Sequence, residues 1–193
     1  MKIEDYQGAT GKILSAQELL KNRRKSGINL LDRLFRSGTL PDASLSGGLA
    51  GKMIDIHISP LLTQIVQFIY RTWKPWQGKV FYPNRSLGYN LIPHNSLILY
   101  RMPFPLYREY RVSGQKTVQA FPFQISIGPG IKDPDVQVMK LDYNLSGNPR
   151  LTFRRLMDEL VYVGEGVYLG KAHFQWYWGR WQTVGYFSLS TKR

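Results

Sequence analysis

The stretch GVYLGKAHFQWYWGRWQTVGYFSL, residues 166–189, decides the fold. Its two halves, 166–175 and 180–189, are rich in aromatic and aliphatic residues, and between them Gly179 can adopt the positive φ of a tight turn. They predict an antiparallel hairpin. One face of the first half alternates very small and aromatic side chains, which is typical of the tapering interior of a small barrel. That face holds Tyr168, Gly170, Ala172, Phe174 and Trp176.

Upstream of this hairpin, most of the chain from Gly78 onward has the composition of short strands. The alternation of Ile54, Ile56 and Ile58 with polar neighbours predicts one more strand before that point. Clusters of Gly, Pro, Asn and Asp separate the runs. Seven or eight sequential strands with short connections favour an antiparallel meander that closes on itself. The remaining candidate strands are 79–82, 97–102, 107–112, 118–127 and 136–141.

The N-terminal part has helical signals instead. Ser15-Ala-Gln-Glu18 has the spacing of a capping box, so we expect a helix to begin there. Apolar residues that recur every four positions predict an inserted helix near 60–74. We therefore expect a single domain, 1–193, mainly β, in which a helical segment, 1–45, packs on an antiparallel barrel, 46–193.

Composition narrows the classes of function. The 193 residues include no cysteine, which excludes disulfides, thiolate nucleophiles and cysteine-ligated metals. There is no apolar run of membrane-spanning length, and the first residues lack the pattern of a secretory signal. We expect a cytoplasmic protein, peripheral to a membrane at most. The formal net charge of +13 suggests an anionic partner.

Several sequence elements occur in an order shared with a group of bacterial proteins. They are Trp76-Gln-Gly-Lys-Val-Phe81, Asn90, the run Leu141-Asp-Tyr-Asn-Leu-Ser-Gly-Asn-Pro149, Arg154 with Asp158-Glu159, and Gly166-Val-Tyr-Leu-Gly170. In these elements the chain resembles an uncharacterised bacterial family of the calycin, or lipocalin-like, class. The resemblance spans roughly residues 30–190. It implies a lipocalin-like antiparallel β-barrel and no particular activity.

Such a barrel predicts non-covalent binding of a small apolar or amphipathic molecule, for example a lipid or a pigment. We expect polar selection at the barrel mouth by Asn90, Asp142, Arg154 and Asp158. If the segment around Arg154 is helical, Arg154 pairs with Asp158 and Arg155 pairs with Glu159, since each acid follows its arginine by four residues. These ion pairs equally fit a purely structural role. The expected lining is completed by Trp76, Phe81, Phe121, Phe123, Tyr168 and Phe174.

Catalysis is an alternative. Asp142 or Asp158 would then be a general acid or base for an apolar substrate, with a carboxyl pKa raised by burial. We do not favour an enzyme, since no nucleophile elbow or complete phosphate-binding loop is present. His57, His94 and His173 have no metal-ligand spacing, so we expect no metal and no cofactor. Haem binding through one of these histidines is an alternative that the sequence leaves open.

The basic residues allow three interpretations. In one of them Arg101, Arg108 and Arg111, interleaved with tyrosines, bind single-stranded nucleic acid by stacking and phosphate contacts. In another, a basic helix beside an apolar barrel mouth holds the protein near anionic lipid; this helix carries Lys21, Arg23, Arg24 and Lys25. The third is a solvated basic surface without a specific partner. Nucleic acid ranks below lipid here because the chain has no known RNA-binding signature. The oligomeric state is left open.

Overall fold

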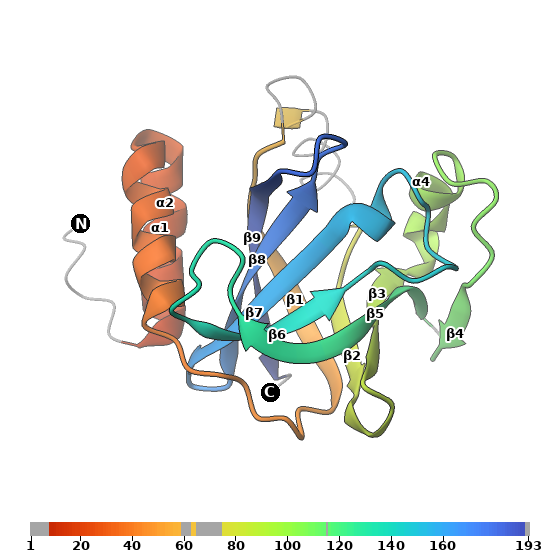
Figure 1. Ribbon diagram of the computed structural model, residues 1–193, viewed down its shortest axis with the longest axis horizontal. Helices are drawn as coiled ribbons and strands as arrows, with labels where there is room; N and C mark the ends of the chain where they lie inside the picture. The colour runs from red at the N-terminus through yellow and green to blue at the C-terminus, as the bar shows by residue number, and fades with distance from the viewer. Residues whose placement is uncertain (1–7, 59–62, 65–74, 115, 192–193) are drawn as a thin grey trace.

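Strand pairing closes a barrel in the computed structural model, which describes residues 8–58, 63–64, 75–114 and 116–191 (Figure 1). Within these residues eight antiparallel strands follow one another around the barrel, and pairing between β1 and β9 and between β3 and β5 completes the ring. The short strand β4 (Arg111–Ser113) extends the sheet beside β5. The eight strands are β1 (Gly47–Ile56), β2 (Gly78–Tyr82), β3 (Leu87–Pro93), β5 (Thr117–Pro129), β6 (Gln137–Asp142), β7 (Leu156–Gly164), β8 (Val167–Gln175) and β9 (Trp181–Thr191).

The predicted mainly β, lipocalin-like antiparallel barrel with N-terminal helices is confirmed. So is its C-terminal hairpin, in which the amide of Trp176 donates to the carbonyl of Arg180 at 2.9 Å and Gly179 has a φ of +84°. Gly170 faces inward, as the alternation predicts. A Cβ atom there would lie 2.2 Å from the ring of Phe187, so glycine is what allows this ring to cross the interior.

Two predicted strands are wrong or shorter than expected. Residues 97–102 largely form the helix α4 (Leu97–Arg101), after a 3₁₀ turn at His94–Ser96. Only Leu97 of this helix is buried, and leucine, tyrosine and arginine suit one turn of helix when no strand partner competes. Of 107–112, only the last two residues enter β4.

Strands β3 and β7 were not among the sequence predictions. Strand β7 shows that the predicted helical ion pairing around Arg154 is wrong, because Arg154 lies in a 3₁₀ turn while Asp158 and Glu159 follow on a strand. Successive strand residues face opposite sides, so Asp158 points into the barrel and Glu159 points out. The helical pairs Arg154–Asp158 and Arg155–Glu159 therefore do not form. The inserted helix predicted near 60–74 falls mostly outside the described residues.

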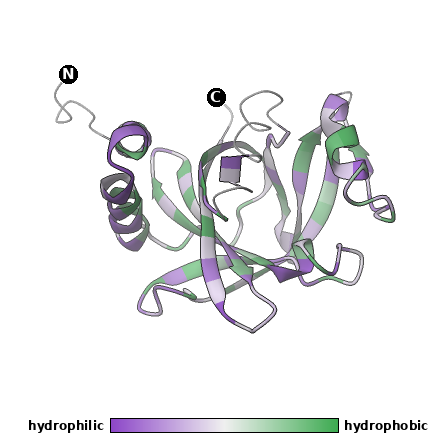
Figure 2. Ribbon diagram, turned by 90° about the horizontal axis from the view of Figure 1, so that it is seen from above, coloured by the Kyte–Doolittle hydropathy of each residue, from purple (hydrophilic) through white to green (hydrophobic). Residues whose placement is uncertain are grey.

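Helices α1 (Ala9–Asn22) and α2 (Arg24–Arg36) pack side by side on one flank of the barrel (Figures 1 and 2). The first begins at Ala9, not at the capping box, and Ser15 is buried within it. The second turns Leu31, Leu34 and Phe35 toward outward-facing aliphatic residues of the sheet. These sheet residues are Val138, Val161, Val167 and Leu169.

Buried charges also connect α2 to the barrel. Lys171 of β8 donates to Asp133, and its ammonium lies 2.7 Å from the carboxylates of both Asp32 and Asp133. Arg36 contacts Asp133 at 2.8 Å. At the other end of α2, Arg24 forms a bidentate pair with Asp55, at 2.8 and 2.7 Å. Aliphatic packing and these ion pairs together fix the helices on the outside of the barrel.

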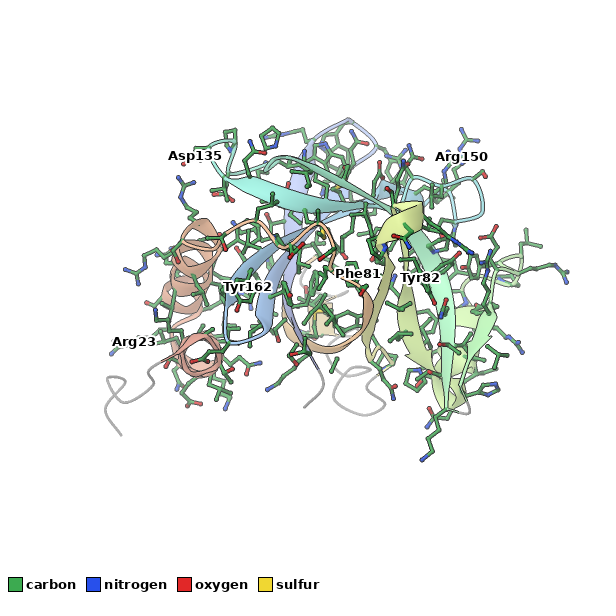
Figure 3. All side chains as sticks on the ribbon, turned by 90° about the horizontal axis from the view of Figure 1, so that it is seen from below. Arg23, Phe81, Tyr82, Asp135, Arg150 and Tyr162 are labelled. Carbon is green, nitrogen blue, oxygen red and sulfur yellow. The ribbon has the colours of Figure 1, made fainter. Side chains whose placement is uncertain are left out.

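The interior differs between the two ends of the barrel. Where β2 ends and β3 begins, close-packed side chains such as Phe81, Phe123 and Leu189 are almost fully buried and fill the centre of the barrel, and a recess of about 200 Å³ lined by Leu45, Ile125 and Met139 remains at this end. We call this the filled end. Figure 3 places Phe81 inside the ring of strands. At the opposite end, where β2 and β7 begin, the packing leaves a cavity. We call this the hollow end.

Candidate binding cavity

The cavity at the hollow end has a volume of about 200 Å³. Its walls are mainly apolar, and aromatic rings from several strands and from the connections contribute to them. Four polar side chains, Lys79, Asn90, Tyr143 and Asp158, reach it from the barrel wall. The apolar and aromatic lining consists of Met53, Trp76, Ile92, Tyr100, Phe121, Phe153, Leu156, Ala172 and Phe187.

Lys79 is the most unusual of these residues because it is a buried lysine inside a barrel. It lies on β2 two residues before Phe81, so both side chains point inward. Its side chain is 2 % exposed, and its ammonium nitrogen lies 2.8 Å from a carboxylate oxygen of Asp158 on β7. Burial of an unpaired charge is costly, so each residue of this pair makes burial of the other tolerable.

A hydrogen-bond network surrounds the ion pair. The Lys79 ammonium donates to Asn90 Oδ1 at 3.0 Å and to the hydroxyl of Tyr143. The Tyr143 hydroxyl donates to Asp158 Oδ2 at 3.0 Å, and Trp76 Nε1 donates to Asn90 Oδ1 at 3.0 Å. The three donor positions of the ammonium are thus used by Asn90, Tyr143 and Asp158. The network fixes the orientation of these four polar side chains.

Aromatic rings enclose the ammonium group. The Lys79 nitrogen lies 5.1 to 5.5 Å from the ring centroids of Trp76, Phe123, Tyr143 and Phe187. These are cation–π distances. Burial lowers the pKa of Lys79 from its ordinary value, although the charge of Asp158 and its hydrogen bond act in the opposite direction.

One acceptor is left over in this network. Among the described residues no hydrogen bond is made to Asp158 Oδ1, whereas Oδ2 accepts from Tyr143 and lies against Lys79. A carboxylate oxygen accepts two hydrogen bonds with ease. The cavity therefore offers one negatively polarised atom to a molecule that enters it.

The structure brings some of the predicted site residues together and separates others. Trp76, Asn90, Phe121 and Asp158 line the cavity. Phe81, Phe123 and Tyr168 belong to the packed interior instead. Phe174 is half-buried, with its ring 5.1 Å from that of Trp176.

Asp142 and Arg154 lie outside the cavity. Asp142 accepts a hydrogen bond from the amide of Asn144 at 2.8 Å, and Arg154 Nε donates to Asn144 Oδ1 at 3.1 Å. The strand alternation explains this position, because Leu141 points inward and its neighbour must point out. The two carboxylates named for acid–base chemistry thus lie on opposite sides of the barrel wall.

Sequence reasoning missed Lys79 and Tyr143. A signal for both was present, since each lies two residues from a core residue of its own strand or strand end, Lys79 from Phe81 and Tyr143 from Leu141. A lysine that alternates with inward phenylalanine is a buried-lysine candidate. The charge partner of Lys79 was not visible in the sequence, because it comes from a strand 79 positions away.

The histidines do not reach the cavity. His57 and His94 are exposed, and His173 faces outward from β8, where its ring lies 3.1 Å from Glu159 and 3.2 Å from Thr183. In the described part of the chain, acidic and histidine side chains form no group of three that could hold a metal ion. In the same part, no helix is long and apolar enough to cross a membrane.

Comparisons of the chain with protein-family models, characterised proteins and solved structures gave no match. The class of protein therefore rests on the strand topology and the interior described above. The resemblance to calycin-like bacterial proteins remains a prediction from the sequence.

Proposed function

We propose that the protein binds a small, mainly apolar, uncharged molecule in the hollow end of the barrel. The observation that carries the proposal is a cavity with aromatic walls and a single cluster of oriented polar groups. Pockets for small molecules commonly combine apolar walls with a few polar groups that fix orientation. Lipocalin-like barrels provide such a cavity within a rigid scaffold.

The volume of the cavity supports a ligand portion the size of one ring or a short alkyl chain. An engineered cavity of about 150 Å³ in another protein holds a benzene molecule, and pockets for drug-sized ligands start near about 300 Å³. At about 200 Å³ this cavity lies between the two. A lipid or an extended pigment would therefore place only one end inside.

The charges of the cavity favour an uncharged ligand. Lys79 and Asp158 neutralise each other, and all three donors of the ammonium are used. A carboxylate ligand would have to displace Asp158, and an ammonium ligand would face the charge of Lys79. Either case buries an unbalanced charge, which is costly. A hydroxyl group satisfies the geometry, since it donates to Asp158 Oδ1 without adding charge.

The acid–base alternative receives less support. Asp158 is held in an ion pair, and Asp142 lies outside the cavity. That the protein binds a ligand without catalysing a reaction stays a prediction, which turnover assays with candidate substrates test.

A set of one-ring probes tests the proposal: toluene, benzyl alcohol, benzoate and benzylammonium. Binding is measured by calorimetry and by chemical-shift changes of the indole of Trp76. We expect benzyl alcohol to bind at least as tightly as toluene, and both charged probes to bind at least tenfold more weakly. The cavity-filling variant Ala172→Phe should abolish binding. Its matched control, Gln124→Phe, adds the same ring at an exposed position of β5 and should bind as the unmodified protein does.

Folding of Ala172→Phe is checked by near-ultraviolet circular dichroism before binding is measured. The proposal is overturned if benzyl alcohol binds equally well to folded Ala172→Phe, or if none of the four probes binds the unmodified protein at millimolar concentration.

A further inference from the structure

Three described connections at the hollow end, those between β3 and β5, β6 and β7, and β8 and β9, form a surface that we call the rim, defined as residues 94–114, 116, 143–155 and 176–180. The connection between β3 and β5 places four large apolar side chains in solvent: Ile98, Met102, Leu106 and Val112. Leu106 is the extreme case at 87 % exposure. Soluble proteins rarely gather such side chains in one place without a partner.

The other two connections continue this pattern. Leu151 is exposed between β6 and β7, and Tyr177 and Trp178 are exposed at the tip of the β8–β9 hairpin. Large apolar side chains of the described residues elsewhere are at most 50 % exposed, whereas the seven exposed ones of the rim range from 58 to 87 %. The most exposed apolar groups of the described chain are thus confined to one end of the barrel.

Direct contacts hold the three connections together. The rings of Phe104 and Phe153 lie 5.5 Å apart, which joins the first connection to the second. The hydroxyl of Tyr177 donates to the carbonyl of Leu151 at 3.1 Å, which joins the third. Between the first two connections lies a groove of about 490 Å³, with walls that include Phe104, Leu106 and Leu151.

The rim is also strongly basic. Its acidic residue is Glu109, whereas its lysine and arginine side chains come from all three connections. Five of the arginines are exposed: Arg101, Arg108, Arg111, Arg150 and Arg180. Arg150 lies on the opposite side of the view from Arg23 of the helices (Figure 3). The cationic residues of the rim are Arg101, Arg108, Arg111, Lys116, Arg150, Arg154, Arg155 and Arg180.

We propose that the rim docks the hollow end of the barrel onto an anionic lipid bilayer. Exposed aliphatic side chains gain free energy by entering the acyl region, tyrosine and tryptophan favour the headgroup level, and arginines attract anionic headgroups. The rim combines all three groups on one face. In this orientation the hollow end of the barrel faces the membrane surface.

A nucleic-acid interface fits the rim less well. Stacking of bases needs exposed aromatic faces. Tyr107 is buried against Phe121, with ring centroids 4.5 Å apart. Tyr110 is covered by Arg101, at 5.5 Å. The two exposed aromatic residues also have ring partners, since Arg155 lies 4.1 Å from the ring centroid of Tyr177 and the ring of Trp178 stacks on that of Trp176. The other exposed apolar side chains of the rim are aliphatic, and lipid accepts such groups whereas single-stranded RNA does not.

Flotation with extruded vesicles tests the proposal on the full-length protein. The vesicles are pure phosphatidylcholine or a 7:3 mixture of phosphatidylcholine and phosphatidylglycerol, a composition chosen at roughly physiological surface charge. We expect binding to the anionic vesicles at 50 mM salt, a marked loss at 500 mM salt, and little binding to the neutral vesicles. The variant Arg108→Glu/Arg150→Glu should bind at least about thirtyfold more weakly, from a contribution of about 1 kcal/mol for each lost cation.

Further variants test whether vesicle binding depends on the residues of the rim or on the overall charge of the protein. Lys25→Glu/Arg33→Glu makes the same charge change at exposed positions of α2 and should bind within twofold of the unmodified protein. Leu106→Asp should weaken binding at least fivefold, whereas Ile127→Asp, at a half-exposed position near the filled end, should not.

The proposal is overturned if the two double variants lose binding equally, if Leu106→Asp binds as the unmodified protein does, or if neutral and anionic vesicles bind alike. It is also overturned if a 30-nucleotide RNA binds and the anionic vesicles do not, which would assign the basic residues to nucleic acid. None of these outcomes depends on whether the cavity holds a ligand.

Discussion

Replacing Asp158 with asparagine should destabilise the protein strongly. The change keeps the size of the side chain but leaves the Lys79 ammonium, with a side chain only 2 % exposed, without a counter-charge. Removal of one partner from a buried ion pair costs about 3–5 kcal/mol. We expect a loss in that range at pH 7, and a similar loss for Lys79→Met, which leaves the carboxylate without its partner.

A double-mutant cycle in urea measures the coupling of the pair. Once either charge is gone, removal of the second costs little, so Lys79→Met/Asp158→Asn should lose about as much as one single variant, which is about 3–5 kcal/mol less than the sum of the single losses. Glu18→Gln serves as the control, because its pair with Lys21 is exposed and should contribute less than about 1 kcal/mol. A loss below about 1 kcal/mol for Asp158→Asn, or additive single losses, would refute the description of this pair.

Three further predictions concern the barrel and its helices. Gly170→Ala should cost about 1–3 kcal/mol in urea unfolding, because its Cβ meets the ring of Phe187; an unchanged midpoint would contradict this. Burial acts to raise the pKa of Asp133, but hydrogen bonds from its two cationic partners outweigh this and lower it. Its stabilisation is therefore present above the unfolded value of 3.8 and lost as the pH falls, so Asp133→Asn should flatten the loss of stability as the pH falls below about 4. Burial and the hydrogen bond to Asp32 raise the pKa of Tyr186 above 10.0, so stability should fall as the pH rises past about 10, and less steeply in Tyr186→Phe.

The barrel was predictable because its signals are local. The alternation of residues 166–189 and the turn residue Gly179 indicate the hairpin. Gly170, a very small residue on the inward face, lies where the ring of Phe187 crosses the interior. The helix at 97–101 was not predictable in the same way. Its apolar run suits a strand as well as a helix, and what decides is that only Leu97 and Tyr100, three positions apart, pack on the core.

The candidate site was half predictable for a different reason. Asn90, Asp158, Trp76 and Phe121 could be named from residue type and position, but their mutual contacts could not. The prediction lacked Lys79, whose charge partner lies on β7. This strand was not predicted, because the spacing of the charged residues around Arg154 suggested a helical turn. An ion pair between two distant strands depends on which side chains the closed barrel brings together. No local sequence pattern encodes these contacts.

A crystal structure of the protein soaked in benzyl alcohol tests the central claim most directly. The account predicts one molecule in the hollow end, with its ring between Phe153 and Phe187 and its hydroxyl within hydrogen-bond distance of Asp158 Oδ1, while Lys79 remains paired with Asp158. If the hollow end stays without the alcohol at saturating concentration, or if side chains have closed it, the claim that this barrel is a binding protein is contradicted.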